Sequence, residues 1–290
     1  MVTRVDATLA HSRLSRDLLS HGVQLACLLE VSAAKPGNIT PAHDFSDTTY
    51  ADMVRSALAL GPAFDRRRAL KRGVGELIAD GVSATARVTH ANTNLGIVLL
   101  FAPLVRAEAT RRADEPLRVA TERILAELDV ADAAAAFAAI VAAHPGGLGD
   151  APDHDVRTPA RVTLRDAMAA AAHRDDIASE YATGYEIVFD TALPLLVEAL
   201  GGGASTLCAI VSLHVGLLAA RRDTLIERKA GAEAARAVTA AARDVRAGTM
   251  TLDEFDASLR GPDHRLNPGT TADLVAATLL VAFLTGVSLP

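Results

Sequence analysis

The segment LGIVLLFAPLVRA, residues 95–107, carries a single charged side chain, Arg106. It is shorter than the ~20 apolar residues that a membrane-spanning helix needs, so we interpret it as a buried helix. A second segment, LVAATLLVAFL at residues 274–284, is apolar on nearly every face of a helix, and such a helix lies in the core of a large helical protein. Together the two segments predict an all-α fold with central buried helices.

The composition also favours helices. Of the 290 residues, 59 are Ala, aromatic residues make up 3% and Trp is absent. Ala is the best helix former, whereas aromatic and β-branched residues favour strands. No segment shows the alternation of a strand, and no period of about 20–50 residues indicates a repeat fold. We therefore expect one all-α domain, residues 1–290, with about ten or more helices.

The spacing of apolar residues and the positions of Pro and Gly predict the helix boundaries. The stretch HPGGLGDAPDHDVRTPA, residues 144–160, has helical patterns of similar quality on both sides, so we interpret it as a long functional loop within one domain. Polar loops are expected at 38–48 and 81–93. The expected helices are residues 8–34, 49–60, 65–80, 95–107, 116–143 (two helices broken near Asp129), 163–173, 175–200, 203–222, 224–247, 251–260, and a last helix that opens at 267–270 with a capping box of Thr270 and Asp273.

The charge and the N-terminal sequence exclude several classes of protein. A net charge of −6 and a pI near 5.8 argue against a general nucleic-acid binder or a protein of anionic membrane surfaces. Cys27 and Cys208 are the only cysteines, so no disulfide framework is expected. The start MVTRVDATLAHSRL lacks the apolar region of a secretory signal. We expect a cytoplasmic protein.

Four segments gather polar residues at predicted helix ends: residues 30–44, 89–96, 223–231 and 267–273. Glu30 follows Leu28 and Leu29, close to the apolar side of its helix, where a carboxylate needs a partner or a metal ion. Asn92-Thr93-Asn94 offers more polar residues than one helix cap uses, which predicts a polar pocket floor at a helix N-terminus. We expect all four segments to converge on one cleft, lined by Glu30, Lys35, Asn92, Asp223 and Asn267.

Each segment also has a plainer interpretation. Lys35-Pro36-Gly37-Asn38 is typical of a helix stop followed by a solvated turn. The segments that begin at Asp223 and Asn267 are typical of helix caps. Asp153-His154-Asp155 is a weaker candidate for metal binding, and His214, within an apolar run, is interpreted as a core histidine.

Lys35 stands out because the chain has three Lys against 26 Arg. Its position beside a Pro-Gly turn suggests an exposed ammonium group without an intramolecular partner. A compact positive charge of this kind suits phosphate. We therefore expect Lys35 to bind a phosphorylated ligand and to contribute little to stability.

In order along the chain, these segments resemble the triphosphoribosyl-dephospho-CoA synthase family, which makes the prosthetic-group precursor of citrate lyase and malonate decarboxylase. Asn94 stands where the family commonly has His, and Ala230 where a second Gly often precedes Gly231. With HDFSDT and NTNLGIVLLFAPL, the chain is similar to a branch outside those two enzyme systems. The matching features are Glu30-Val31-Ser32-Ala33 leading to Lys35-Pro36-Gly37, His43-Asp44, Asn92-Thr93 with Gly96, Asp223-Thr224 with Arg228 and Gly231, and Leu266-Asn267-Pro268-Gly269 running into Ala272-Asp273-Leu274.

The resemblance implies a transferase that joins C1 of the ATP ribose to the 2′-hydroxyl of 3′-dephospho-CoA, or a related acceptor, and releases adenine. It implies Mg²⁺ as cofactor, ATP and dephospho-CoA as substrates, and neither a nucleic-acid nor a membrane partner; a homodimer is compatible with it. Glu30, Asp44 and Asp223 are the candidate catalytic residues and metal ligands, and the sequence leaves open which carboxylate is the base. The candidate substrate-binding residues are Lys35, Pro36, Gly37, Asn38, His43, Asn92, Thr93, Asn94, Gly96, Arg228, Lys229, Asn267, Gly269 and Asp273.

Two other functions stay open at this point. A metal-dependent hydrolase of a nucleotide or ribosyl bond would use the same carboxylates with water as acceptor. A non-catalytic helical scaffold would have merely solvated polar loops and would bind no nucleotide. Ligand binding to the native state raises its stability, so a thermal shift with ATP and Mg²⁺ separates the scaffold from both enzymes.

Overall fold

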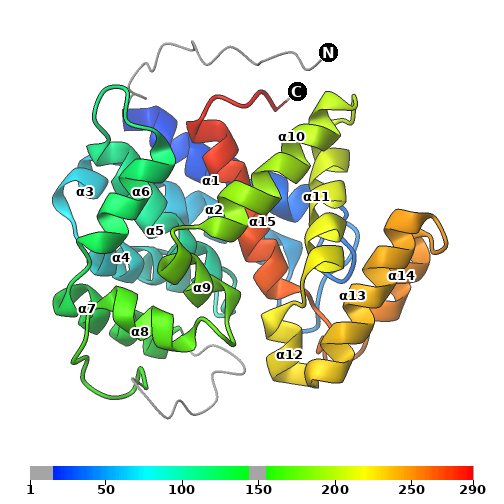
Figure 1. Ribbon diagram of the computed structural model, residues 1–290. Coiled ribbons are helices and arrows are strands. Elements are labelled where there is room, and N and C mark those ends of the chain that lie inside the picture. The colour runs from blue at the N-terminus through cyan, green and yellow to red at the C-terminus, as the bar shows by residue number, and fades with distance from the viewer. Residues whose placement is uncertain (1–15, 144–154, 290) are drawn as a thin grey trace.

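A computed structural model describes residues 16–143 and 155–289 of the chain (Figure 1). These ranges contain fifteen α-helices, one short π-helix and no β-strand. The all-α prediction and the expected number of helices are confirmed. The elements are α1 Arg16–Ser32, α2 Tyr50–Ala63, α3 Arg66–Lys71, α4 Val74–Ala86, α5 Leu95–Thr110, α6 Leu117–Ala126, α7 Val130–Ala142, α8 Leu164–Ala171, α9 Asp176–Thr183, η1 Ile187–Ala192, α10 Leu193–Gly201, α11 Thr206–Ala220, α12 Thr224–Ala230, α13 Ala232–Ala247, α14 Leu252–Leu259 and α15 Gly269–Leu284.

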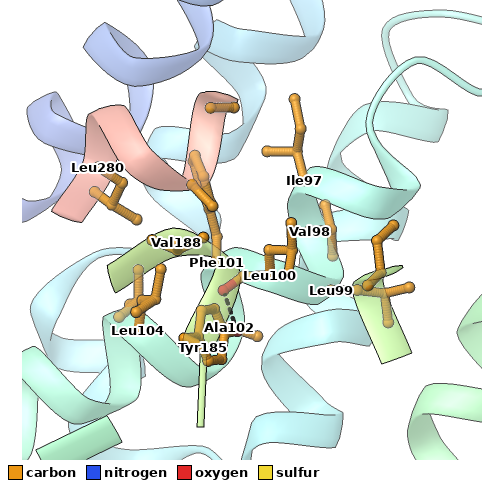
Figure 2. Packing of buried hydrophobic residues seen from close by; sticks show 14 of the residues in the cluster. Ile97, Val98, Leu99, Leu100, Phe101, Ala102, Leu104, Tyr185, Val188 and Leu280 are labelled. Atoms are coloured by element: carbon orange, nitrogen blue, oxygen red, sulfur yellow. Dashed lines mark hydrogen bonds between the residues drawn. The ribbon is translucent and has the colours of Figure 1, made fainter. Parts of the chain in front are cut away.

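Helices α5 and α15 lie at the centre of the molecule, as the apolar segments 95–107 and 274–284 predict. Helix α15 contacts α1, α5, η1 and α11, and it runs through the middle of the bundle (Figure 1). Leu100 of α5, Leu280 of α15 and Val188 of η1 are fully buried in the main core (Figure 2). Residues 97–105 of α5 and 274–282 of α15 are all buried, which explains why neither stretch has a polar face.

Pro103 lies inside α5 without breaking it. Proline has no N–H group, so the carbonyl of Leu99, four residues earlier, lacks its usual helical donor. The Tyr181 hydroxyl donates to this carbonyl at 2.6 Å. The Tyr185 hydroxyl donates to the carbonyl of Leu100 at 2.6 Å (Figure 2). The Tyr181 hydroxyl thus replaces the missing donor, the Tyr185 hydroxyl adds a hydrogen bond to the next carbonyl, and α5 stays continuous.

The predicted helix at 65–80 is wrong in its extent. Arg72 and Gly73 separate α3 from α4, and Gly73 occupies the position before the first residue of α4. Helix α4 then continues to Ala86, so the loop expected at 81–93 begins later than predicted. Residues 8–15 of the first predicted helix lie outside the described residues.

The predicted helices at 175–200 and 224–247 are also interrupted. Gly184 has φ of 72° and Gly231 has φ of 91°. Both angles lie in the left-handed region, which glycine adopts without steric cost and which ends a right-handed helix. Gly184 therefore ends α9 before η1, and Gly231 separates α12 from α13.

The side chain of Glu180 accepts hydrogen bonds from the backbone N–H groups at the start of η1. Its two carboxylate oxygens accept the N–H groups of Ile187 at 2.8 Å and of Val188 at 3.0 Å. Burial raises the pKa of Glu180 to about 7, against the opposing effect of these two hydrogen bonds. The side chain is fully buried, so its protonation is linked to the stability of the fold.

The last helix begins at Gly269, close to the predicted position, but without the predicted capping box. Pro268 occupies the N-cap position and provides no side-chain hydrogen bond. The N–H and the hydroxyl of Thr271 instead donate to Oδ2 of Asp223, each at 2.7 Å. Asp223, from a distant segment, thus accepts the hydrogen bonds of Thr271 at the start of α15. A capping pattern within residues 267–273 does not reveal this partner.

The main hydrophobic core draws on both halves of the chain. It includes Ile140 before the loop expected at 144–160 and Leu164 after it. Residues 144–154 of that loop lie outside the described residues; 155–160 contain no helix. No helix in the described ranges is long and apolar enough to cross a membrane. A smaller cluster joins α11 to α14 through Val215, Leu218, Ala219, Ile226, Ala235, Val238, Ala242, Phe255 and Leu259.

Candidate functional site

A cavity of about 1010 Å³ lies among the ends of several helices. All four polar segments that were expected to converge contribute residues to its lining. The predicted site residues that line it are Glu30, Asn38, Asn92, Thr93, Gly96, Arg228, Lys229, Asn267, Gly269 and Asp273. The predicted site residues outside the lining are Lys35, Pro36, Gly37, His43, Asp44, Asn94 and Asp223.

Lys35 is buried, and its expected exposure is wrong. Its side chain is 0% exposed, its ammonium group lies 2.8 Å from Oε1 of Glu30, and it also donates to the Glu30 backbone carbonyl. The chain folds back at the end of α1, where the Lys35 N–H donates to the Ala33 carbonyl at 2.7 Å. The ammonium group therefore contacts Glu30, a cavity-lining carboxylate that is itself only 3% exposed.

The turn after Lys35 joins the first polar segment to the fourth. Gly37 has φ of 77°, and its N–H donates to Oδ1 of Asp256 at 2.8 Å. Asn38 donates from Nδ2 to Oδ1 of Asn267 at 2.7 Å. Oδ1 of Asn38 is buried and has no hydrogen-bond partner within the part of the chain that the structure describes. The Asn38–Asn267 pair thus forms one edge of the cavity.

His214 lies behind this turn. It is completely buried in α11, and its Nε2 is 3.3 Å from the carbonyl of Pro36. Burial, together with the nearby charge of Lys35, lowers the pKa of His214 to about 3. The imidazole is therefore neutral and Nε2 donates to the carbonyl, in agreement with the core histidine that the sequence suggests.

Asp223 supports the helices around the cavity. It is 1% exposed, and its Oδ1 accepts the N–H groups of Leu225 at 2.9 Å and of Ile226 at 3.0 Å. Its Oδ2 accepts both donors of Thr271. Burial raises its pKa, against the effect of these hydrogen bonds. Four donors occupy the carboxylate, so it joins α12 to α15 and does not line the cavity.

Asp44 and His43 also lie away from the cavity lining. Both are exposed, and Oδ1 of Asp44 accepts the N–H of Tyr50 at 2.6 Å, next to the start of α2. The expected metal ligands Glu30, Asp44 and Asp223 are thus not brought together. Within residues 16–143 and 155–289, no group of three or more His, Cys, Asp or Glu is placed to hold a metal ion.

Asp273 is the second acidic residue at the cavity floor. It forms no hydrogen bond or ion pair with another described residue, and its carboxylate lies so close to Gly96 that a Cβ there would overlap Oδ2. Burial raises its pKa well above the usual value, and the charges of Glu30, Asp223 and Asp175 raise it further. Gly96 is therefore required for the position of a carboxylate that faces the cavity.

The Asn92–Asn94 segment contributes two of its three residues to the cavity. The Thr93 hydroxyl forms a 2.6 Å hydrogen bond with Ser56, and Oδ1 of Asn92 accepts the N–H of Leu95 at 3.3 Å. Asn94 occupies the N-cap position of α5 but makes no side-chain capping bond, and its buried Nδ2 has no partner among the described residues. Asn92 and Thr93 therefore present polar groups at the start of α5, as the sequence predicts.

The basic side of the cavity consists of Arg228 and Lys229 of α12 and of Arg174, which lies just before α9. Arg228 pairs with Asp175 at 2.7 Å, whereas Lys229 and Arg174 form no ion pair in the described ranges. Arg174 and Asp175 also line the cavity, although they were not among the predicted site residues. They lie at a predicted helix start, like the four selected segments, so their position was the signal that could have identified them.

An apolar wall was also missed. Phe137 and Ile140 of α7, Met168 of α8 and Ile177 of α9 line the side of the cavity formed by these three helices. Their residue types and spacing match those of ordinary core positions, so no local pattern distinguishes them. The cavity therefore has an acidic floor, a basic side and an apolar wall.

These features define a class: an all-α protein whose helix ends surround a deep cavity suited to a phosphorylated ligand with an apolar part. The chain belongs to the ATP:dephospho-CoA triphosphoribosyl transferase (CitG) family, an enzyme family, whose sequence pattern matches residues 16–288. The chain is also similar to the crystal structure of a candidate triphosphoribosyl-dephospho-CoA synthase from Archaeoglobus fulgidus, with 26% identity and a TM-score of 0.64. That match covers 80% of this chain and 99% of the other. No curated protein sequence matches this chain.

Proposed function

We propose that the protein transfers the triphosphoribosyl group of ATP to the 2′-hydroxyl of 3′-dephospho-CoA. The bond between C1 of the ribose and the adenine nitrogen breaks, and a bond from C1 to the acceptor oxygen forms. The proton of the attacking hydroxyl passes to a carboxylate, and adenine leaves after it takes up a proton. The observation that carries this proposal is the cavity, where acidic, basic and amide side chains from all four segments meet.

The basic side of the cavity suits the triphosphate. Lys229 and Arg174 have no acidic partner among the described residues, and Arg228 is fixed by Asp175. Charged donors bind phosphate oxygens more strongly than neutral donors do. We assign the triphosphate to this side, in place of the Lys35 site expected from the sequence.

The acidic floor suits the reacting centre. Glu30 and Asp273 line the cavity, and the charge of Glu30 contributes to the raised pKa of Asp273. A sugar carbon that loses its leaving group develops positive charge, which nearby carboxylates stabilise, and one carboxylate must accept the hydroxyl proton. The Glu30–Asp273 pair supplies both functions.

The same pair fits Mg²⁺. The unpartnered Asp273 carboxylate next to Glu30 is an arrangement that a cation stabilises. Mg²⁺ in nucleotide sites commonly uses one or two carboxylates together with substrate phosphates and water, so a preformed cluster of three ligands is not required. Bound there, Mg²⁺ would neutralise triphosphate charge, while Glu30 and Asp273 orient it.

The cavity is large for a site that binds one small ligand. Its volume of about 1010 Å³ is at the upper end of the roughly 300–1,000 Å³ typical of a site for one small ligand. The apolar wall of Phe137, Ile140, Met168 and Ile177 offers a surface for the less polar parts of the acceptor. The homodimer compatible with the family stays a prediction.

The test is acceptor dependence. The protein is incubated with ATP and Mg²⁺, with and without dephospho-CoA, and free adenine and the mass of the adduct are measured. Adenine release that requires dephospho-CoA and matches the adduct in amount supports transfer. Adenine release without acceptor supports the hydrolase, and the absence of any nucleotide effect on the melting temperature supports the scaffold.

A further inference from the structure

Phe45 and His264 form a stacked ring pair at the cavity. Their ring centroids are 3.9 Å apart and their planes differ by 14°. Phe45 lies in the loop between α1 and α2, and His264 lies in the loop between α14 and α15. Both residues line the cavity and both are half-buried, so part of each ring remains accessible.

The orientation of the pair is fixed by its surroundings. The N–H of Ser46 donates to Nε2 of His264 at 3.3 Å, so this nitrogen is the acceptor and the imidazole cannot turn freely. His264 has φ of 49°, in the left-handed region that residues with a side chain rarely adopt. Backbone strain of this kind persists where the surrounding structure holds it, and it is concentrated at ligand-binding sites.

The pair differs from the other ring contacts of the protein. Among the described residues, the remaining two ring pairs are Phe64–Phe101 and Tyr181–Tyr185, and all four of those rings are buried in the core. The chain has only seven Phe, three Tyr and no Trp. In the described ranges, Phe45–His264 is therefore the one stacked pair with surface available to a ligand.

We propose that the Phe45–His264 pair is a stacking platform for the adenine ring of a nucleotide substrate. This rests on the proposed function, in which both the triphosphoribosyl donor and the acceptor carry adenine. A flat base gains stability when it stacks on an aromatic face, and any base can do so because each has a π face. Phe45 directly follows the first segment and His264 lies three residues before the fourth, and the Asn38–Asn267 hydrogen bond joins these two segments at the cavity edge. A base on this platform would keep the attached ribose next to that edge.

The experiment is calorimetric titration of four ligands: ATP with Mg²⁺, dephospho-CoA, tripolyphosphate and 4′-phosphopantetheine. Phe45→Leu keeps apolar volume but removes the π face, and His264→Asn keeps a residue that tolerates left-handed φ. We expect each variant to raise the Kd of at least one adenine nucleotide by about fivefold or more, the fold-change at the lower end of base–aromatic stacking. The Kd values of tripolyphosphate and 4′-phosphopantetheine, which lack adenine, should change less than twofold.

Two controls separate stacking from structure. Phe45→Tyr keeps the ring and should bind both nucleotides like the wild type. Phe189→Leu removes a ring that contacts Arg118 outside the cavity lining, and it should also leave all four Kd values unchanged.

The outcomes decide the proposal. A rise in Kd for ATP alone assigns the platform to the donor, and a rise for dephospho-CoA alone assigns it to the acceptor. Unchanged affinity for both nucleotides overturns the platform, and so does an equal loss for the two ligands that lack adenine. A wild-type protein that binds neither nucleotide contradicts the proposed function itself, whereas normal wild-type binding with unaffected variants contradicts only the platform.

Discussion

Lys35→Met is the substitution with the clearest expected consequence. Lys35 is completely buried and its ammonium group lies 2.8 Å from the buried carboxylate of Glu30. Methionine fills a similar volume without charge, so the variant leaves Glu30 as a buried carboxylate without its cation. We expect a large loss of stability and a smaller direct effect on ATP binding, because Lys35 does not line the cavity.

The magnitude follows from the burial of both partners. Removal of one member of a buried ion pair costs about 3–5 kcal/mol, because the remaining charge stays buried. At roughly 2–4 °C per kcal/mol for a domain of this size, the melting temperature should fall by roughly 6–20 °C. The double variant Glu30→Gln, Lys35→Met removes both charges and should be more stable than Lys35→Met alone.

The assay is thermal unfolding of these variants, with Lys71→Met as the matched control. Lys71 is an exposed lysine at the end of α3, and its replacement should change stability by within about 0.5 kcal/mol. ATP affinity is measured at a temperature where each variant is folded. If Lys35→Met melts like the wild type and binds ATP at least tenfold more weakly, Lys35 is a phosphate ligand and its ion pair with Glu30 does not stabilise the fold.

Asp223→Asn should lower the free energy of unfolding by about 2 kcal/mol in chemical denaturation, because an amide nitrogen would face the N–H of Thr271; an unchanged midpoint would contradict the four-donor interpretation. Gly96→Ala should reduce adenine release at least tenfold, because its Cβ displaces the Asp273 carboxylate, whereas Gly201→Ala, in open space, should not; equal turnover of the two variants would argue against a role for Asp273. Stability should fall as pH rises from about 4.5 to about 7, because the folded protein retains on Glu180 a proton that the unfolded chain releases. Over this pH range, the free energy of unfolding of the wild type should fall by about 3 kcal/mol relative to that of Glu180→Gln. If the free energies of unfolding of the two proteins change with pH in parallel, protonation of Glu180 does not contribute to stability.

The sequence predicted the central helices well because their chemistry is local. A segment such as 95–107 has no polar face, and only a fully enclosed helix accommodates it. The interruptions at Gly184 and Gly231 were missed because a glycine inside a helical pattern does not reveal the sign of its φ angle. The break before η1 depends further on Glu180, whose carboxylate binds N–H groups beyond the turn.

The sequence predicted correctly which segments meet at the cavity, but it did not predict which of their side chains line it. Glu30, Asn92 and Asn267 reach the cavity, as the surplus of polar residues at helix ends suggests. Lys35 and Asp223 do not, because their partners come from tertiary packing: one folds back onto Glu30, and the other accepts hydrogen bonds from the start of α15. A sequence pattern shows where polar groups gather, but it does not show which of them are already satisfied by the protein.

We propose that the cavity transfers a ribosyl group to a hydroxyl of a second substrate and excludes water from the reacting centre. The most direct measurement is a single-turnover reaction with ATP, Mg²⁺ and dephospho-CoA in H₂¹⁸O, analysed by mass spectrometry. We expect free adenine and an unlabelled triphosphoribosyl adduct in equal amounts, because the oxygen bonded to C1 in the product comes from the acceptor hydroxyl. Ribose triphosphate labelled with ¹⁸O, formed without the adduct, would contradict this proposal.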